Sequence, residues 1–308
     1  MSERLMTTTV AVETLPEAAL ANPLLADGLV RTGPYWSQQS LSAESAHWDG
    51  LATENEIHAA ISTFSEKKEE LKSREMVQSV LQHVAPGERL LDLGCGYGRI
   101  AKYLLPLVRL GAYVGVDCSP VMLKKFHERY AASDAERTTP LVLVRGDIDR
   151  IPLQDASIDT AIVSAVYLHN HKDVTRASIA EIHRVLKPGG RLLVLSSFPN
   201  SQNLTGLQGW AFLSYLKLRG EGRKNGPVRY FARREIENLL SEFKNVTIQP
   251  MGFSVLPKTI LGMPVGWRFP YRRFYDRVHA FLERRVSTAF RRAFCVYFDV
   301  VAHKDADA

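Results

Sequence analysis

The chain has few cysteines and no long apolar run. Only three of its 308 residues are cysteines, and the spacing of Cys95, Cys118 and Cys295 fits neither a disulfide framework nor a zinc site. No apolar stretch approaches the roughly eighteen residues of a membrane-spanning helix, and the first residues lack a continuous apolar signal core. These absences predict a reducing compartment, a cytoplasmic location and no bound metal.

Three nucleotide-related signatures are also missing. The glycines at 94, 96 and 98 leave Arg99 where a dinucleotide-binding loop has its third glycine. No Gly-Lys-Ser/Thr ends the loop, as a phosphate-binding loop would require. Residues 164–167 read Ser-Ala-Val-Tyr, whereas base-modifying enzymes use an Asn/Asp-Pro-Pro-aromatic tetrad there. A nicotinamide cofactor and a nucleic-acid substrate are therefore disfavoured.

The most informative segment that is present is Leu-Leu-Asp-Leu-Gly-Cys-Gly-Tyr-Gly at 90–98. It predicts a buried parallel strand, then a glycine turn that opens a helix at 100–104. Glycine lets a ligand lie against the backbone, so this unit predicts a nucleoside-binding loop. The Asp92 carboxylate would repel a pyrophosphate, but it suits a ligand that carries an ammonium and a sulfonium, such as S-adenosylmethionine.

Three more predicted strands end near the same edge of the sheet. The strand at 112–117 ends in Asp117, about twenty residues after the loop, where a carboxylate can accept both ribose hydroxyls. Ser119 and Pro120 then start a helix, as an N-cap and a first-turn proline. Segments 141–145 and 158–164 are the third and fourth strands. An open α/β sheet binds its ligands at the carboxyl ends of its strands.

Residues 71–195 resemble a class I S-adenosylmethionine-dependent methyltransferase, in the small-molecule and quinone-biosynthesis-like group with a methyltransferase domain of type 11. The resemblance implies an α/β fold with a Rossmann-like, doubly wound, seven-stranded sheet whose last strand is antiparallel. The matching segments, in family order, are Leu-Asp-Leu-Gly-Cys-Gly-Tyr-Gly (91–98), Val-Gly-Val-Asp-Cys-Ser-Pro-Val-Met-Leu (114–123), Gly-Asp-Ile (146–148), Ser-Ile-Asp-Thr-Ala-Ile-Val-Ser (157–164) and Arg-Val-Leu-Lys-Pro-Gly-Gly-Arg-Leu-Leu (184–193).

The resemblance also implies the cofactor contacts. Asp92 and the glycine loop would hold the methionine part of S-adenosylmethionine, and Asp117 would hold its ribose. Asp147 and the Ile148 amide would meet the adenine edge, and Met122 the adenine face. S-adenosylhomocysteine would be the product. The expected cofactor-binding residues are Asp92, Gly94, Cys95, Gly96, Gly98, Asp117, Cys118, Met122, Asp147, Ile148 and Ser164.

Two histidines and several aromatic residues are candidates for the acceptor side. A histidine near the methyl donor can remove a proton from a hydroxyl or an amine. His169 matches a position where related enzymes often carry a histidine, and His171 is the second candidate. A role for His169 in contacting the cofactor or completing its loop stays open. The aromatic residues expected to bind the acceptor are Tyr35, Trp36, Tyr167 and Trp210.

The chain divides into one catalytic domain and its additions. Residues 1–30 are expected to form a flexible tail, 31–84 a helical cap and 85–308 the methyltransferase domain. Two insertions follow the fifth and sixth strands: a lid at 197–230 and a basic helical segment at 257–292.

Arginines crowd the segment 268–292, which holds most of the net charge of +6. Written as a helix, this segment places apolar and basic residues on opposite faces. A solvated basic face, contact with an anionic membrane surface and contact with an acidic or lipid-like substrate all stay open.

These patterns predict a cytoplasmic S-adenosylmethionine-dependent methyltransferase. Its acceptor is expected to be small and apolar, prenylated or lipid-like, with oxygen favoured over carbon or nitrogen as the methylated atom. Two alternatives remain: a non-catalytic module of the same fold that binds S-adenosylmethionine or a partner protein, and an enzyme that methylates a lipid at a membrane surface.

Overall fold

The structure is a computed structural model. It describes residues 22–38, 41, 48–49, 66–131, 139–202, 206–207, 214, 218, 228–252, 259–260, 263–264, 281, 285, 287, 289–290 and 295–307.

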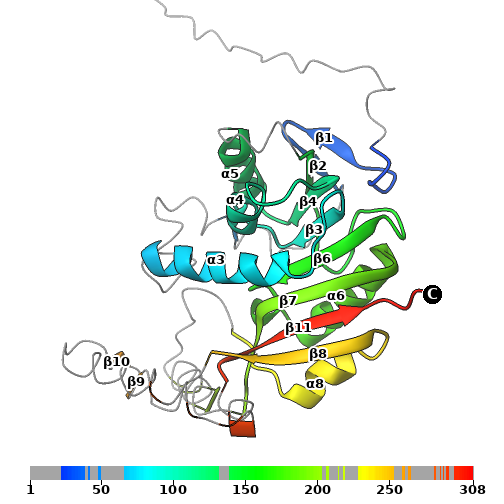
Figure 1. Cartoon of the computed structure of the whole chain (residues 1–308). Helices are drawn as coiled ribbons and strands as arrows, with labels where there is room; N and C mark the ends of the chain where they lie inside the picture. The colour runs from blue at the N-terminus through cyan, green and yellow to red at the C-terminus, as the bar shows by residue number, and fades with distance from the viewer. Residues whose placement is uncertain are drawn as a thin grey trace, which may run out of the picture.

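One mixed sheet of nine strands forms the centre of this described part (Figure 1). Its spatial order is β1-β2-β5-β4-β3-β6-β7-β11-β8. The strands are β1 (Val30–Thr32), β2 (Tyr35–Ser37), β3 (Arg89–Leu93), β4 (Ala112–Asp117), β5 (Leu141–Arg145), β6 (Ile158–Ser164), β7 (Leu186–Pro199), β8 (Lys244–Met251) and β11 (Tyr297–His303). A separate antiparallel pair joins β9 (Thr259–Ile260) and β10 (Met263–Pro264).

The central strands are parallel and apolar. β5, β4, β3, β6 and β7 pair in parallel, whereas β11 pairs antiparallel with both β7 and β8. Leu90, Leu91 and Leu93 of β3 are fully buried, as expected for a strand that helices cover on both faces. The predicted doubly wound α/β fold with an antiparallel last strand is confirmed.

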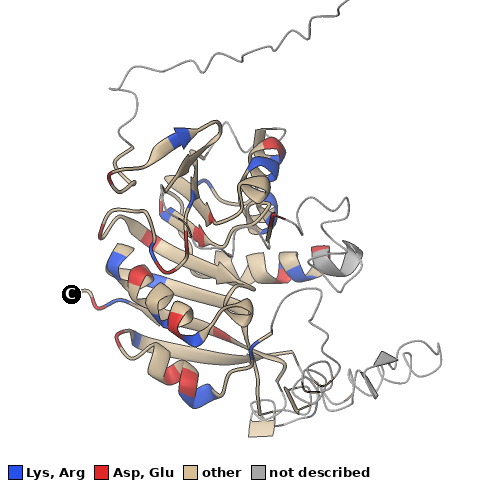
Figure 2. Ribbon diagram, turned by 180° about the vertical axis from the view of Figure 1, so that it is seen from behind, with Lys and Arg blue, Asp and Glu red and all other residues tan. Residues whose placement is uncertain are grey.

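Helices cover the two faces of the sheet, and each face has its own apolar core. Figures 1 and 2 view the sheet from opposite sides. One core contains buried side chains of α3 (Glu66–Leu81), α4 (Arg99–Leu104) and α5 (Pro120–Ala131). The other contains side chains of α6 (Lys172–Val185) and α8 (Arg233–Leu239). Acidic and basic residues are interspersed along α6 and α8 (Figure 2), as on helices with a solvated face.

The sheet has two strands more than predicted, because residues 30–37 form a β-hairpin. The expectation of a helical cap starting at 31 is wrong for this segment. β2 pairs in parallel with β5, with Trp36 opposite Val144. Valine, threonine, tyrosine and tryptophan around a Gly-Pro turn favour strands. Leu24 and Leu25 are also buried, so residues 22–30 do not belong to a flexible tail.

Several predictions concern parts of the chain outside the described residues. These parts are residues 1–21, most of the insertions at 197–230 and 257–292, and most of the arginine-rich segment 268–292. Their proposed roles stay predictions. Among the helices that the structure describes, none is long and apolar enough to cross a membrane.

A carboxyl group and a phenol are paired in the interior between β3 and β4. The Tyr113 hydroxyl donates a hydrogen bond to Asp92 Oδ2 at 2.5 Å, and both side chains are buried. Burial raises the pKa of Asp92 from 3.8 to about 7, although the Tyr113 hydrogen bond and the Arg99 charge lower it. The folded chain therefore keeps a proton on Asp92 between pH 3.8 and about pH 7 that the unfolded chain releases.

We predict that this proton makes stability depend on pH. The contribution of Asp92 to the free energy of unfolding should fall as pH rises through that window, because the folded state binds the extra proton. Replacing Asp92 by Asn removes the titration. The free energy of unfolding of the variant, minus that of the wild type, should therefore increase as the pH rises from about 4 to about 7, by on the order of a few kcal/mol in total. Urea unfolding at a series of pH values measures this difference.

Asp173→Asn is the control, because the Asp173 side chain is 86% exposed. Burial also raises the pKa of Asp299 to about 6. Asp299 makes the free energy of unfolding depend on pH in the same way in the wild type and both variants, so its effect cancels when their stabilities are compared. A stability difference between Asp92→Asn and the wild type that stays constant with pH would contradict the prediction.

Candidate functional site

The loop between β3 and α4 is packed tightly at both of its ends. A Cβ atom on Gly94 would lie 2.5 Å from Val166 Cγ2, and one on Gly98 would lie 2.4 Å from Phe126 Cδ2. Any side chain at either position would therefore displace its neighbour. The two glycines let the loop pack closely against the tip of β6 and against α5.

The middle of the loop, by contrast, faces open space and the tip of β4. Gly96 has a φ of +52°, and nothing lies within 4 Å of a Cβ atom built on it. Its N–H donates to Asp117 Oδ2 at 2.8 Å, and the Ser119 N–H donates to Asp117 Oδ1 at 2.9 Å. Burial raises the pKa of Asp117, while the Ser119 and Gly96 amides oppose that rise. Each carboxylate oxygen keeps a lone pair that can accept a ligand hydroxyl.

The tip of β5 lies beside Asp117. The Gly146 N–H donates to the Asp117 carbonyl at 3.1 Å. The next residue, Asp147, is buried, and its N–H donates to Gln38 Oε1 at 3.1 Å. Its carboxylate lies 3.4 Å from Arg150 Nη2. The structure therefore brings Asp147, and Ile148 after it, to the same edge as the glycine loop.

The remaining expected cofactor residues play different parts. Met122 is buried and packs with Tyr97, which comes from the glycine loop. Cys95 is buried in the core, and burial raises the pKa of its thiol well above the ordinary value, which supports a packing role for it. The backbone carbonyl of Cys118 accepts a hydrogen bond from Arg145 Nε at 3.2 Å.

Arg99 lies beside the candidate site, although it was not among the residues expected there from the sequence. Its Nη2 donates to Ser164 Oγ at 3.0 Å, and the Ser164 hydroxyl lies 3.4 Å from Met76 Sδ. The charge of Arg99 also acts on Asp92. Its place directly after the last glycine was the available signal, although from the sequence alone that position only disfavoured a dinucleotide loop.

The two candidate histidines have different surroundings. His169 ends the short 3₁₀ turn η3 (Tyr167–His169) after β6, and its ring lies 5.3 Å from the Trp48 ring, between centroids. The His171 side chain is 79% exposed, with Nδ1 3.3 Å from Asp173 Oδ2. Of the two, His169 is the partly enclosed one.

The aromatic residues predicted to bind the acceptor are not gathered at one place. Tyr167 is fully buried, and its hydroxyl shares a hydrogen bond with Ser178 Oγ at 3.2 Å, so it is a core residue. Tyr35 and Trp36 lie on β2, four strand steps from β6, which corresponds to about 19 Å. Trp210 is outside the described residues. Tyr167, which was expected to bind the acceptor, is buried in the core instead, and acceptor binding by Tyr35 and Trp36 stays a prediction.

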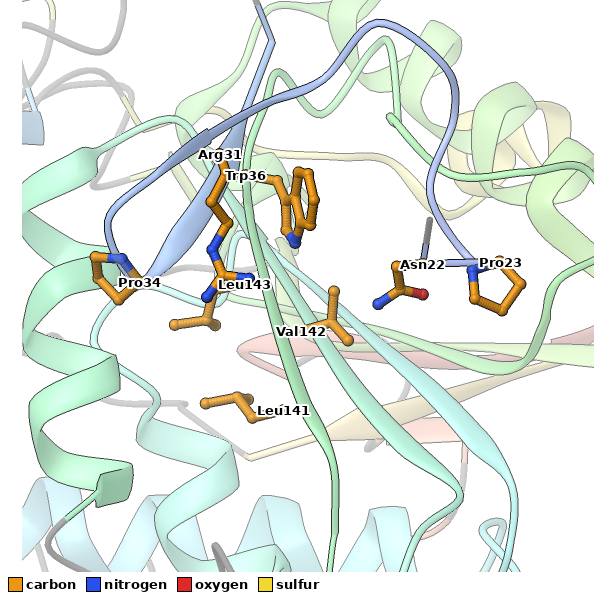
Figure 3. A pocket seen from close by; sticks show the side chains of 8 residues that line it. All are labelled: Asn22, Pro23, Arg31, Pro34, Trp36, Leu141, Val142 and Leu143. Carbon is orange, nitrogen blue, oxygen red and sulfur yellow. The ribbon is translucent and has the colours of Figure 1, made fainter. Parts of the chain in front are cut away.

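Trp36 instead lines a separate hollow of about 400 Å³ (Figure 3). The Arg31 guanidinium lies 5.4 Å from the centre of the Trp36 ring, and Leu141, Val142 and Leu143 form another part of the lining. These three residues begin β5, whereas the glycine loop meets the carboxyl ends of the strands. The hollow therefore lies away from the candidate site. In the described parts of the chain, no group of three or more histidine, cysteine or acidic residues could hold a metal ion.

Two curated relatives match somewhat more than a third of the chain. A phthiotriol/phenolphthiotriol dimycocerosates methyltransferase of Mycobacterium leprae is 31% identical over 117 residues, which cover 38% of this chain and 40% of that protein. A demethylmenaquinone methyltransferase of Symbiobacterium thermophilum is 34% identical over 118 residues, which cover 37% of this chain and 45% of that protein. The alignments thus span less than half of each relative.

Solved structures match a larger part of the chain at lower identity. A chain from the complex between the Trm112 methyltransferase activator of Haloferax volcanii and a methyltransferase has a TM-score of 0.55 and 17% identity, covering 84% of this chain and 97% of that one. Phosphoethanolamine N-methyltransferase 2 of Haemonchus contortus, in complex with S-adenosyl-L-methionine, has a TM-score of 0.52 and 17% identity, covering 87% and 61%. These similarities support the fold.

The family model for a methyltransferase domain matches residues 91–194. This segment begins in β3, contains the glycine loop, Asp117 and Asp147, and ends in β7. The strand order of the sheet places the loop of this matched segment at the carboxyl edge of a doubly wound sheet. Residues 91–194 therefore match the methyltransferase domain family, and the described part of the chain has the fold of the solved methyltransferases that it resembles.

Proposed function

We propose that the protein transfers a methyl group from S-adenosylmethionine to a small apolar acceptor. The observation that carries this proposal is the open space over Gly96, directly beside the Asp117 carboxylate that its N–H contacts at 2.8 Å. A nucleoside that lies against Gly96 would meet a carboxylate able to accept its ribose hydroxyls. The domain match at 91–194 supports the same cofactor.

The residues at the carboxyl edge fit the parts of S-adenosylmethionine. Asp117 would hold the ribose, and Asp147 with the Ile148 amide would hold the adenine edge. Met122 would pack on the adenine face. The amides and open backbone of the glycine loop would lie along the methionine part, and the negative charges nearby would favour its cationic groups. Asp92 is buried and accepts a hydrogen bond from Tyr113, so we propose that it stabilises the strand that leads into the glycine loop and does not itself contact the ligand.

Bound S-adenosylmethionine supplies an electrophilic methyl group on a sulfonium. For a hydroxyl acceptor, the bond from carbon to sulfur breaks as the bond from carbon to the acceptor oxygen forms, and the hydroxyl proton must leave. His169, at the end of the η3 turn that follows β6, is the proposed base that accepts this proton. The exposed His171 is not proposed for this role.

The two relatives suggest the class of acceptor. By their names, one methylates phthiotriol and phenolphthiotriol dimycocerosates and the other a demethylmenaquinone. We therefore propose an acceptor with an oxygen-bearing ring or chain attached to an apolar tail. Methylation at oxygen is the first alternative to test and methylation at carbon the second. Contact of the 268–292 segment with a membrane would give access to such an acceptor.

We predict that S-adenosylhomocysteine binds the purified chain and that Asp117→Asn weakens this binding. Hydrogen bonds to a charged group contribute about 1.5 to 3 kcal/mol, so the dissociation constant should rise about tenfold to a hundredfold. Isothermal titration calorimetry measures it, with Asp173→Asn as a control that should bind like the wild type. A wild type that binds only a nicotinamide dinucleotide would refute the proposed function, and an unchanged Asp117→Asn would refute the role of Asp117.

We predict that His169→Ala lowers methyl transfer without weakening cofactor binding. General-base catalysis typically contributes about 10²-fold or more, so kcat should fall by at least that factor for a hydroxylated acceptor. Transfer of a radiolabelled methyl group is measured against a panel of apolar phenols, demethylated quinols and long-chain alcohols. His171→Ala should keep the wild-type rate. Cofactor binding with no transfer to any member of the panel would favour the non-catalytic module.

A further inference from the structure

Two neighbouring residues that lie between β2 and β3 in the sequence, Trp48 and Asp49, contact opposite sides of the proposed site. Asp49 Oδ1 accepts a hydrogen bond from Ser119 Oγ at 2.5 Å, just beyond β4. The Trp48 ring packs against the His169 ring, beyond β6. In the sheet, β3 and its glycine loop lie between β4 and β6. The pair therefore spans the carboxyl edge from the donor side to the acceptor side.

Asp49 is held by a residue that orders the donor side. Ser119 is fully buried, and its N–H donates to Asp117. Its hydroxyl oxygen accepts from the Met122 N–H at 3.2 Å. A hydroxyl has one hydrogen to donate, and in Ser119 this hydrogen goes to Asp49. The short bond to an ionised acceptor is of the strong kind, so Asp49 has a fixed place beside the proposed ribose and adenine contacts.

The charge of Asp49 also acts on the donor side. Burial is the main cause that raises the pKa of Asp117, and the negative charge of Asp49 adds to it. Two carboxyl groups therefore lie close together beside the glycine loop. Such a pair favours a ligand with positive charge, as S-adenosylmethionine has.

Trp48 gives the His169 ring a neighbour on the other side of the loop. The two rings are 5.3 Å apart between centroids, at 76° to each other, which is the edge-to-face geometry that aromatic rings prefer. The backbone of η3 is held by the bond from the His169 N–H to the Val166 carbonyl and by the bond from the Arg229 N–H to the Leu168 carbonyl. These bonds fix the backbone of the turn, and the contact with the indole limits the orientations of the imidazole.

We propose that Trp48 is a positioning residue that holds the His169 imidazole toward the acceptor, and that Asp49 anchors Trp48 to the donor side through Ser119. This inference rests on the proposed function, because it takes His169 as the group that accepts the acceptor proton. It adds two residues to the site that lie outside the matched domain segment 91–194.

The test is the rate at which diethyl pyrocarbonate modifies His169 in the full chain, followed by peptide mass spectrometry. Trp48→Ala should raise this rate about two- to tenfold. The reason is that an edge-to-face aromatic pair stabilises the packed orientation of the His169 ring over other orientations by about that factor. Asp49→Ala should raise it as well, and Trp48→Phe should stay near the wild type. With an acceptor found in the panel, Trp48→Ala should lower kcat and leave the KM for S-adenosylmethionine unchanged.

His171 is the internal reference, because it is two residues away and already exposed. Its modification rate should be equal in all variants, and Asp155→Ala should match the wild type at both histidines. An unchanged rate at His169 in Trp48→Ala overturns the inference. Faster modification of every histidine also overturns it, because Trp48 would then only stabilise the fold. S-adenosylhomocysteine binding by the wild type is measured in parallel, so a failure of the proposed function is seen separately.

Discussion

The arrangement of the site depends on the absence of two side chains, at Gly94 and Gly98. Each glycine lets the loop lie where a Cβ atom would collide with a neighbour, Val166 beyond β6 in one case and Phe126 of α5 in the other. The loop is therefore fixed by the same packing that joins the central strands to their helices. Gly96 lies between the two fixed points and faces open space, so a ligand can approach a backbone that is already held in place.

The central fold could be predicted because its signals are local in the sequence. β4, β5 and β6 are mainly apolar runs that end in a polar residue, and β3 is an apolar run directly before Gly94. The hairpin at 30–37 was missed because its strands have only three residues each, too few for a periodic pattern.

Site residues whose position is set by their own strand could be predicted from the sequence, whereas residues positioned by contacts with distant parts of the chain could not. Asp117 is the last residue of β4, so its position at the sheet edge could be predicted from the sequence. The inward orientation of Tyr167 depends on η3 and on a stacked ring, Phe198, that comes from β7. The contact between Asp49 and Ser119 joins residues 70 positions apart, and no periodicity in the sequence carries that information.

The place of β11 in the sheet has a consequence for how the chain is made. Among the described strands, β8 pairs only with β11, although β8 comes about 50 residues earlier in the chain. During synthesis β8 therefore has no strand to pair with until residues 297–303 have been made, whereas the strands around the glycine loop can already pair. At about 5 to 20 residues per second this delay lasts a few seconds. The cofactor half of the sheet can thus assemble on the ribosome before the sheet is complete.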